Sequence, residues 1–164
     1  MAKALRSEDT VKVQGLDKFR RELKKIEESG GADGIALLKE ANYRVASMVV
    51  EKAQARASSI GPMQAKAAAS LKPGRQQARA VVSGGGARVP FFYGAEFGAY
   101  RGLRRTARDS GRSFIGHNQF LPWKKPGNGN TGYFLFPTMK AETQNIIDMY
   151  GKELDKIAKD AFPD

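Results

Sequence analysis

The chain has 164 residues, enough for one hydrophobic core and too few for two of ordinary size, so a single domain over residues 1–164 is expected. It contains no cysteine, which excludes disulfides, thiolate chemistry and Cys-ligated metal centres. Its 28 Lys and Arg residues outnumber its 17 Asp and Glu residues, and the net charge of +11 indicates a polyanionic or acidic neighbour.

The first third of the chain is expected to be mainly helical. Residues 11–13 alternate apolar and charged side chains and could form a short strand before Gly15. Apolar residues then recur at steps of three and four over residues 16–28, which predicts an amphipathic helix that ends at residues 29–31.

A second, longer helix is expected next. Asp33 can cap it, because a carboxylate accepts hydrogen bonds from the free backbone donors of a first helical turn. The helical spacing of apolar residues continues to about Ser58, and the Gly61–Pro62 pair marks the break. Residues 63–71 are expected to form one more short helix.

From Gln76 the pattern becomes that of β-structure. Small or apolar side chains alternate with others up to Val82, and glycines at 84–86 then turn the chain before the aromatic residues 89–93. This pattern predicts a β-hairpin whose second strand is the aromatic stretch, in the sequence VPFFYGAEFG.

A long connection and a final helix complete the predicted fold. Residues 99–132 are too long and too rich in Gly, Arg and Asn for an ordinary connector, so we expect a functional loop that changes state on assembly. Pro137 is expected in the first turn of a C-terminal amphipathic helix that runs to about residue 161. The order of elements predicts an α+β fold: an N-terminal helix, a long central helix, a small antiparallel sheet (the hairpin), the basic loop and the C-terminal helix.

The aromatic rings and the positive charge gather in the same region. Residues 89–137 contain most of the Phe, Tyr and Trp residues of the chain. Residues 99–132 carry seven cations and one carboxylate, so a net +6 of the total +11 lies in this loop. We therefore expect the loop and its aromatic flanks to carry the function.

The sequence offers little for catalysis. His117 is the only histidine and has no nucleophile motif beside it, so a solvated loop residue is the better interpretation. Gly127, Gly129 and Gly132 match G-x-G-x-x-G, but no strand precedes them and no helix follows directly, so a turn is expected instead of a phosphate site. The scattered acidic residues form no metal-binding pattern. We expect no catalytic residue, no cofactor, no metal and no enzymatic activity.

No stretch approaches the ~20 apolar residues of a membrane span, and residues 1–10 lack the apolar core of a secretion signal. A protein without membrane contact, and not exported by that route, is therefore expected.

Three features keep more than one interpretation. Glu96 could pair with an arginine of a neighbouring subunit, or it could be an acid at a helix start or turn. The arginine-rich sequence RGLRRTAR, at residues 101–108, could contact nucleic acid, or it could be a solvated loop or the partner of an acidic protein ring. Trp123 could dock on another subunit, or it could cover the core of its own chain.

Several motifs in their order along the chain resemble the tail-completion and head-tail joining (neck) proteins of long-tailed bacteriophages, in the version found in phages of actinobacteria. The motifs are GLDKFRREL near the N-terminus, the long Ala/Val helix, the hairpin, FYGAEFG, NQFLPWKKPGNGNTGYFLFPT and the closing helix after GYFLFPTMKAE. Tyr93, Ala95, Glu96, Phe97 and Gly98 match the family's A-x-F-x-E-F-G pattern, and residues 134–137 match its P-F-L-x-P-A pattern. The chain departs from the family at residues 63–71, which are alanine-rich in place of D-T-G-x-L, and at Tyr133, where an Arg-Pro pair is usual.

The resemblance implies a structural virion protein without catalysis. It implies a closed homo-oligomeric ring, with six subunits expected in preference to twelve, in the neck between head and tail. The implied partners are the connector or stopper protein, the tail terminator or tube protein, and the packaged DNA that passes through the channel. The implied location is the virion neck, after assembly in the host cytoplasm.

Two sets of residues are expected to carry this function. The subunit or ring interface is expected to include Glu96, Phe97, Tyr100, Phe120, Leu121, Pro122, Trp123, Tyr133 and Phe134. The surface toward the DNA channel or an acidic partner is expected to include Arg101, Arg104, Arg105, Arg108, Arg112, Lys124 and Lys125. The alternative function is a free basic DNA-binding protein, which the net charge and the interleaved Arg and aromatic residues also fit.

Overall fold

The structure is a computed structural model that describes residues 16–28, 33–99, 105–106, 113–114, 119–124 and 131–161. Their contacts divide the chain into two compact units. Unit 1 comprises Met1–Lys52, Lys72–Ser83 and Met139–Asp164, and unit 2 comprises Ala53–Leu71 and Gly84–Thr138. The expectation of a single domain over residues 1–164 stays a prediction.

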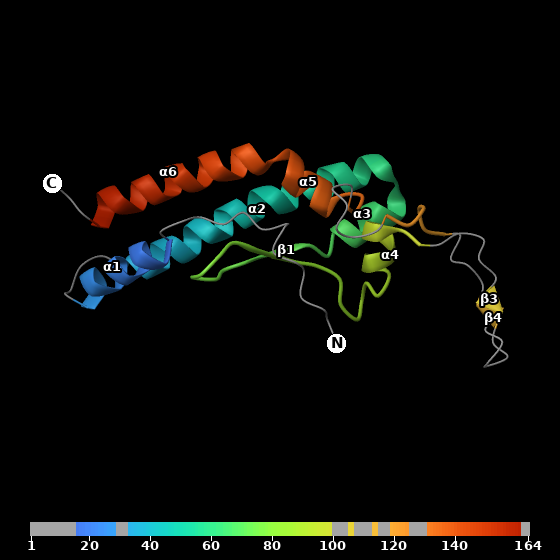
Figure 1. Cartoon of the computed structure of the whole chain (residues 1–164), viewed down its shortest axis with the longest axis horizontal. Coiled ribbons are helices and arrows are strands. Elements are labelled where there is room, and N and C mark those ends of the chain that lie inside the picture. Colours follow the sequence, from blue (N-terminus) through green and yellow to red (C-terminus); the bar gives the residue numbers. More distant parts are fainter. Residues whose placement is uncertain are drawn as a thin grey trace. The chain divides into compact units, whose positions relative to one another are not determined.

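The described residues form mainly helices, with two small antiparallel sheets (Figure 1). The helices are α1 (Leu16–Glu28), α2 (Gly34–Ile60), α3 (Pro62–Ala68), α4 (Phe92–Phe97), α5 (Leu135–Ala141) and α6 (Thr143–Ala161). The strands are β1 (Lys72–Gly74), β2 (Val81–Ser83), β3 (Arg105–Thr106) and β4 (Ser113–Phe114). The predicted α+β class is confirmed.

The start and the end of helix α2 agree with the sequence signals. The backbone N–H of Ala36 donates to Asp33 Oδ1 at 2.8 Å, so Asp33 caps the helix as predicted. The helix ends at Ile60, and Pro62 begins the short helix α3, where its missing N–H costs no helical hydrogen bond. The three helices expected before residue 72 are thus confirmed, with shifts of a few residues at their ends.

The core of unit 1 lies where α1, α2 and α6 meet. Its fully buried members are Leu23 of α1, Leu38 and Ala41 of α2 and Ile157 of α6. Four partly buried side chains pack against them: Phe19, Ile35, Leu37 and Leu154. All eight lie at helical spacing on their own elements, so the amphipathic patterns in the sequence specify this core directly.

A buried polar cluster ties the β1–β2 connection to the helices of unit 1. Asn42 of α2 is fully buried and donates from Nδ2 to the carbonyl oxygens of Gln76, at 2.7 Å, and Gln77, at 3.2 Å. The Tyr150 hydroxyl of α6 donates to Asn42 Oδ1, and burial raises the pKa of this tyrosine. Asn42 therefore satisfies backbone and side-chain groups that would otherwise lose their hydrogen bonds with water.

The predicted hairpin is wrong in its second strand. Strand β2 pairs with β1, in the register Lys72↔Ser83 and Gly74↔Val81, and residues 92–97 form helix α4. Phe92, Ala95 and Glu96 are buried at helical spacing, and this burial outweighs the β-propensity of the aromatic residues. Gly85 and Gly86 turn the chain with positive φ angles of 82° and 107°.

The end of the chain also differs from its prediction. The expected C-terminal helix is two helices, α5 and α6, separated at Glu142. Pro137 lies in the first turn of α5, as predicted. Residues 99–132 are not all loop, since β3 and β4 pair antiparallel within them. The strand expected at residues 11–13 lies outside the described residues.

The buried polar cluster of unit 1 generates a stability prediction. Replacing Asn42 with Ala leaves two carbonyl groups and a hydroxyl without their partner, so we expect the free energy of unfolding to fall by about 2–3 kcal/mol. Tyr150→Phe removes a single hydrogen bond and should cost about 1 kcal/mol. Urea unfolding followed by circular dichroism measures both, and equal losses in the two variants would contradict the central role of Asn42.

Candidate functional site

The most constrained group of unit 2 is the carboxylate of Glu96, which lies on α4 and is fully buried. Its Oε2 accepts hydrogen bonds from the backbone N–H groups of Phe134, at 3.2 Å, and Leu135, at 3.0 Å. Its Oε1 accepts one from the N–H of Phe136, at 3.2 Å. These N–H groups belong to the start of α5, whose first turn has no acidic residue of its own. Glu96 therefore caps a helix that begins 39 residues further along the chain.

Two opposing effects act on the pKa of Glu96. Removal from water favours the neutral acid and raises the pKa above the ordinary value of 4.5. The backbone donors at Leu135, Phe136, Phe134 and Tyr133 favour the charged form and oppose the rise. The rise prevails. Glu96 is thus a carboxyl group whose charge is costly and whose acceptor atoms are fully used.

Glycine at position 132 makes this contact possible. Gly132 has a φ of +75°, in the left-handed region that other residues rarely adopt, and a Cβ placed on it would overlap Glu96 Oε1. The third glycine of the G-x-G-x-x-G match therefore allows close approach to a carboxylate. The turn predicted over residues 127–132 lies mostly outside the described residues and stays a prediction.

Aromatic rings surround the capped helix start. Phe92 and Phe134 pack edge to face with 5.8 Å between ring centroids, and Phe134 is fully buried. Phe97 packs against Phe136 at 5.5 Å and stacks nearly parallel with Tyr93 at 6.3 Å. These contacts join α4 to α5 on either side of Glu96, so the carboxylate lies in an apolar setting that water does not reach.

Residues 119–124 return to the same place and are fixed there by backbone hydrogen bonds. The N–H of Ala99 donates to Leu121 O at 2.8 Å, and the N–H of Lys124 donates to Phe97 O at 2.7 Å. The Tyr133 hydroxyl donates to Pro122 O at 2.7 Å. Both ends of the segment that carries the arginines, at Ala99 and Leu121, are therefore anchored at one point of unit 2.

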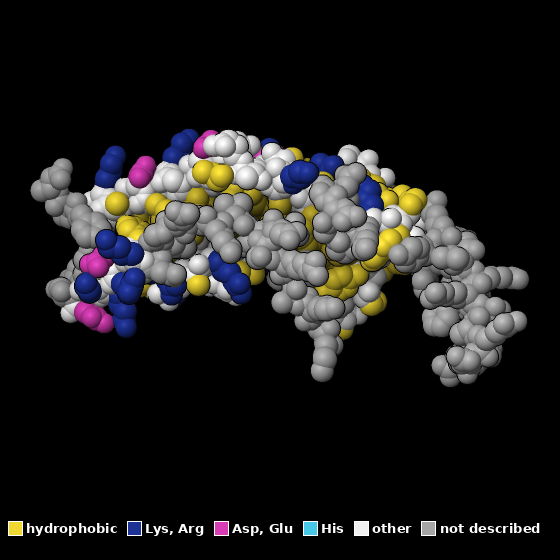
Figure 2. All heavy atoms as spheres, in the orientation of Figure 1, with side chains coloured by type: hydrophobic (Ala, Val, Ile, Leu, Met, Phe, Trp, Pro, Cys, Tyr) yellow, Lys and Arg dark blue, Asp and Glu magenta, His cyan; other side chains and the backbone are white. Residues whose placement is uncertain are grey.

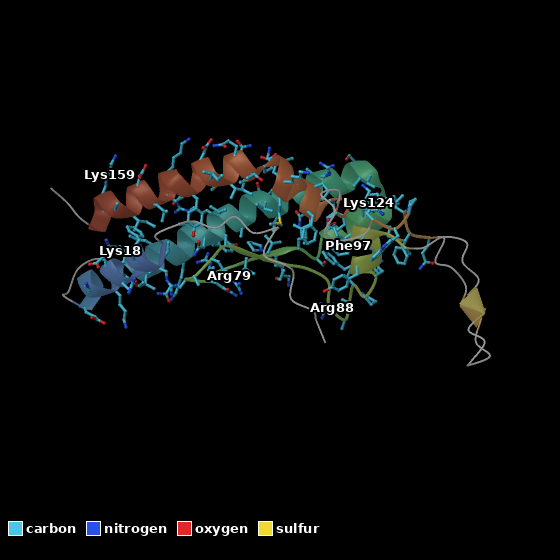
Figure 3. The ribbon with its side chains drawn as sticks, in the orientation of Figure 1. Lys18, Arg79, Arg88, Phe97, Lys124 and Lys159 are labelled. Atoms are coloured by element: carbon cyan, nitrogen blue, oxygen red, sulfur yellow. The ribbon has the colours of Figure 1, made fainter. Side chains whose placement is uncertain are left out.

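Two large side chains of this unit face solvent. Tyr93 is 69% exposed and Trp123 is 37% exposed, and Figure 2 shows hydrophobic side chains at the surface around α4. Lys124, labelled in Figure 3, belongs to the same unit. Its Nζ lies 4.1 Å from the centroid of the Tyr133 ring. Exposed aromatic rings, and a cation held over a ring, are typical of binding surfaces.

The structure separates the predicted interface residues into two groups. Glu96, Phe97, Phe120 and Phe134 are buried within their own chain, so they cannot form an exposed interface and we remove them from it. Leu121 and Tyr133 are partly buried, and Pro122 and Trp123 are exposed. Glu96 lies in the last turn of α4, and its hydrogen bonds go to the start of α5 in the same chain, an arrangement that neither of its two interpretations described.

Most of the predicted DNA-facing residues lie outside the described part of the chain. Tyr100 of the interface set and the cations Arg101, Arg104, Arg108, Arg112 and Lys125 lie outside the described residues, as do His117, Gly127 and Gly129. Arg105 lies in β3, and its side chain is outside the described part. Lys124 is described and lies over Tyr133. That these cations face the DNA channel or an acidic partner stays a prediction.

Sequence reasoning missed the pairing of Glu96 with the start of α5 and the exposure of Tyr93. A signal for the first was present: the GYFLFP segment begins a helix without an acid or a capping side chain of its own, so its donors must find an acceptor elsewhere. The sequence gives no comparable signal for the exposure of the Tyr93 side chain. This segment was expected to be a strand, in which alternate residues are buried.

Within the described residues, no group of three or more His, Cys, Asp or Glu side chains could hold a metal ion. The described helices also include none that is long and apolar enough to cross a bilayer. Comparisons with protein-family models, with curated proteins and with solved structures found no match to this chain.

The Glu96 contact generates the first prediction for this site. Glu96→Ala removes the acceptor of three backbone donors and leaves a cavity beside Phe134, so we expect the free energy of unfolding to fall by about 3 kcal/mol or more. The matched control is Glu22→Ala, which removes an exposed ion pair with Lys25 and should change stability by less than about 0.5 kcal/mol. Similar stability of the two variants would show that the contact is not formed.

Because the pKa of Glu96 is raised, the difference in stability between wild type and Glu96→Ala should depend on pH. Between about pH 4.5 and the raised value, the folded chain holds a proton on Glu96 that the unfolded chain releases. The resulting stabilisation is fully present below that window and is lost as pH rises through the raised pKa. The stability difference between wild type and Glu96→Ala should therefore be smaller at about pH 8 than at about pH 4.5. A difference that grows with pH would mean that the backbone donors outweigh burial.

Alanine substitutions at Gly132 and Gly151 form a matched pair of stability tests. Gly132→Ala forces a side chain into Glu96 at a positive φ, and we expect a loss of about 2 kcal/mol or more. Gly151→Ala lies within helix α6 with open space around the new Cβ, so it should gain up to about 1 kcal/mol. Thermal unfolding of both variants checks the prediction, and a stable Gly132→Ala variant would contradict it.

Proposed function

We propose that this chain is a structural subunit of a homo-oligomeric ring in the neck of a long-tailed bacteriophage, joining the head to the tail around the DNA channel. It acts by assembly and catalyses no reaction. Its neighbours in the virion are a head-side connector or stopper protein and a tail-side terminator or tube protein.

The observation that carries the proposal is the hydrogen bonding of Glu96 to the start of α5. The most specific part of the resemblance is the block NQFLPWKKPGNGNTGYFLFPT, which contains GYFLFP. In this chain, the acid of another motif of the resemblance, GAEFG, caps the helix that GYFLFP begins. Gly132 precedes that helix start and has no room for a side chain beside Glu96. The two motifs therefore depend on each other physically in this chain, which supports the interpretation that they act as one unit.

The arrangement of charge supports an assembly around DNA. Unit 2 contains ten Lys and Arg residues and two acidic residues in its sequence, Glu96 and Asp109. Glu96 is buried, and it is the only acidic side chain among the described residues of this unit. Both ends of the arginine-bearing segment are anchored through Ala99 and Lys124. A fixed base that carries a basic segment suits a ring subunit that neutralises phosphate charge in a channel.

The alternative function, a free DNA-binding protein, rests on the same charge. It differs in what the isolated chain should do: a free DNA-binding protein binds duplex DNA as a monomer, with affinity that falls steeply with salt. A ring subunit gains its DNA contact through assembly.

The test is to locate the chain in particles and in solution. We expect it in purified tailed particles of the phage that encodes it, at a copy number equal to one ring, with matching density in the neck by electron microscopy. Light scattering should give the mass of the purified chain, and electrophoretic mobility should show weak monomer binding to duplex DNA at physiological salt. Absence from particles, together with tight monomer binding to DNA, would overturn the ring in favour of the free DNA-binding protein.

A further inference from the structure

Residues 120–124 cross the C-terminal end of helix α4, and we term them the clasp. The backbone N–H of Lys124 donates to the carbonyl oxygen of Phe97 at 2.7 Å. In the other direction, the N–H of Ala99 donates to the carbonyl oxygen of Leu121 at 2.8 Å. The clasp therefore holds together the two ends of the segment that carries the arginines.

Two glycines allow the clasp to lie close to α4. Gly98, at the C-terminal end of the helix, has a φ of +76°, and a Cβ placed on it would overlap the clasp backbone at Pro122. A Cβ placed on Gly94 would overlap the ring of Phe120. That ring is buried, so Phe120 supplies an apolar contact between the clasp and α4.

The rest of the clasp lies near solvent. Pro122 and Trp123 are exposed, and Leu121 and Lys124 are partly buried. The Tyr133 hydroxyl donates to Pro122 O in an exposed hydrogen bond of 2.7 Å. Segments that have exposed hydrogen bonds and bury few apolar side chains open at a lower cost in free energy than the core does. We expect the clasp to be of this kind.

The hydrogen bonds between Glu96 and α5 differ in this respect. Their acceptor is fully buried, and so is Phe134, which gives one of the three N–H donors. The other two donors belong to Leu135 and Phe136. No atom of residues 120–124 takes part in these three bonds, so the clasp can separate from α4 while α5 stays capped.

We propose that the clasp opens as one piece while α5 stays capped, which gives unit 2 a closed and an open state. In the closed state, the segment with five arginines is fixed at Ala99 and Leu121. In the open state, its fixed ends are the end of α4 and Gly132, and Lys124 and Lys125 belong to the released segment. Opening thus raises the number of cations on that segment from five to seven. The two states belong to the isolated chain, with or without the proposed ring.

Amide hydrogen exchange of the full chain, followed by NMR at low urea concentrations, tests the two states. The N–H groups of Ala99 and Lys124 are termed the clasp amides. We expect them to exchange through an opening that depends little on urea, because it exposes little surface. The N–H groups of Leu135 and Phe136, which donate to Glu96, should exchange more slowly and through urea-dependent unfolding. The same urea dependence for both pairs would contradict the proposal.

A pair of conservative variants separates local opening from unfolding. Tyr133→Phe removes the hydroxyl donor to Pro122 and should speed the exchange of the clasp amides about fivefold. The matched control is Leu71→Val, which removes a buried methylene group from the same unit and lowers the stability of that unit by a similar amount. Because the clasp opens without unfolding, Leu71→Val should leave the exchange of the clasp amides unchanged. Equal acceleration in the two variants would mean that these amides exchange by unfolding, and would reject the clasp.

Gly98→Ala should hold the clasp open. Its Cβ would overlap the backbone of Pro122 at a positive φ, and a backbone carbonyl cannot rotate away as a side chain can. We expect the clasp amides to lose their protection while the N–H of Leu135 keeps it. The matched control is Gly86→Ala, which also adds a side chain at a positive φ, of +107°, but with open space around it, and it should leave the clasp amides protected. Protected clasp amides in Gly98→Ala would overturn the proposal, and so would loss of protection at Leu135, since the two contacts would then open together.

Discussion

The buried carboxylate of Glu96 is the constraint on which unit 2 depends. A charge removed from water is unfavourable unless its acceptor atoms are fully used, and here three backbone donors at the start of α5 use them. The same donors would be unsatisfied without Glu96, because the first turn of α5 has no acid of its own. Each side of the contact therefore requires the other. Phe97 and Phe134 then exclude water from it, and the backbone of Phe97 holds residues 119–124 in place.

In unit 1, a buried neutral side chain, the amide of Asn42, has a role comparable to that of Glu96. The β1–β2 connection has few apolar side chains to bury, and Asn42 secures it by donating to the carbonyl oxygens of Gln76 and Gln77. Tyr150 completes the hydrogen bonding of this amide from α6. Outside this cluster, Arg75 lies over the Tyr43 ring at 4.3 Å and pairs with Glu40 at 3.1 Å, where solvent weakens the ion pair. In both units a buried polar side chain fixes a segment that hydrophobic contacts alone would leave poorly specified.

The sequence predicted those parts of the fold that depend on neighbouring residues. Helices α1, α2, α3 and α6 follow from apolar periodicity, and the cap at Asp33 follows from local hydrogen bonding. The segment at residues 89–98 was wrong as a strand, because its burial at helical spacing depends on Phe120 and Phe134, which come much later in the chain. The partners of Glu96 were not predictable from spacing, since they lie 38 to 40 residues away. Pro122 and Trp123 are exposed and their role in an interface stays a prediction, whereas four of their expected companions are buried.

The burial of Glu96 also shapes the outer surface. Because this carboxylate is used inside the chain, the placed cations of unit 2 have no exposed carboxylate on the described part of that unit to pair with. Exposed positive charge of this density repels itself and favours binding to anions.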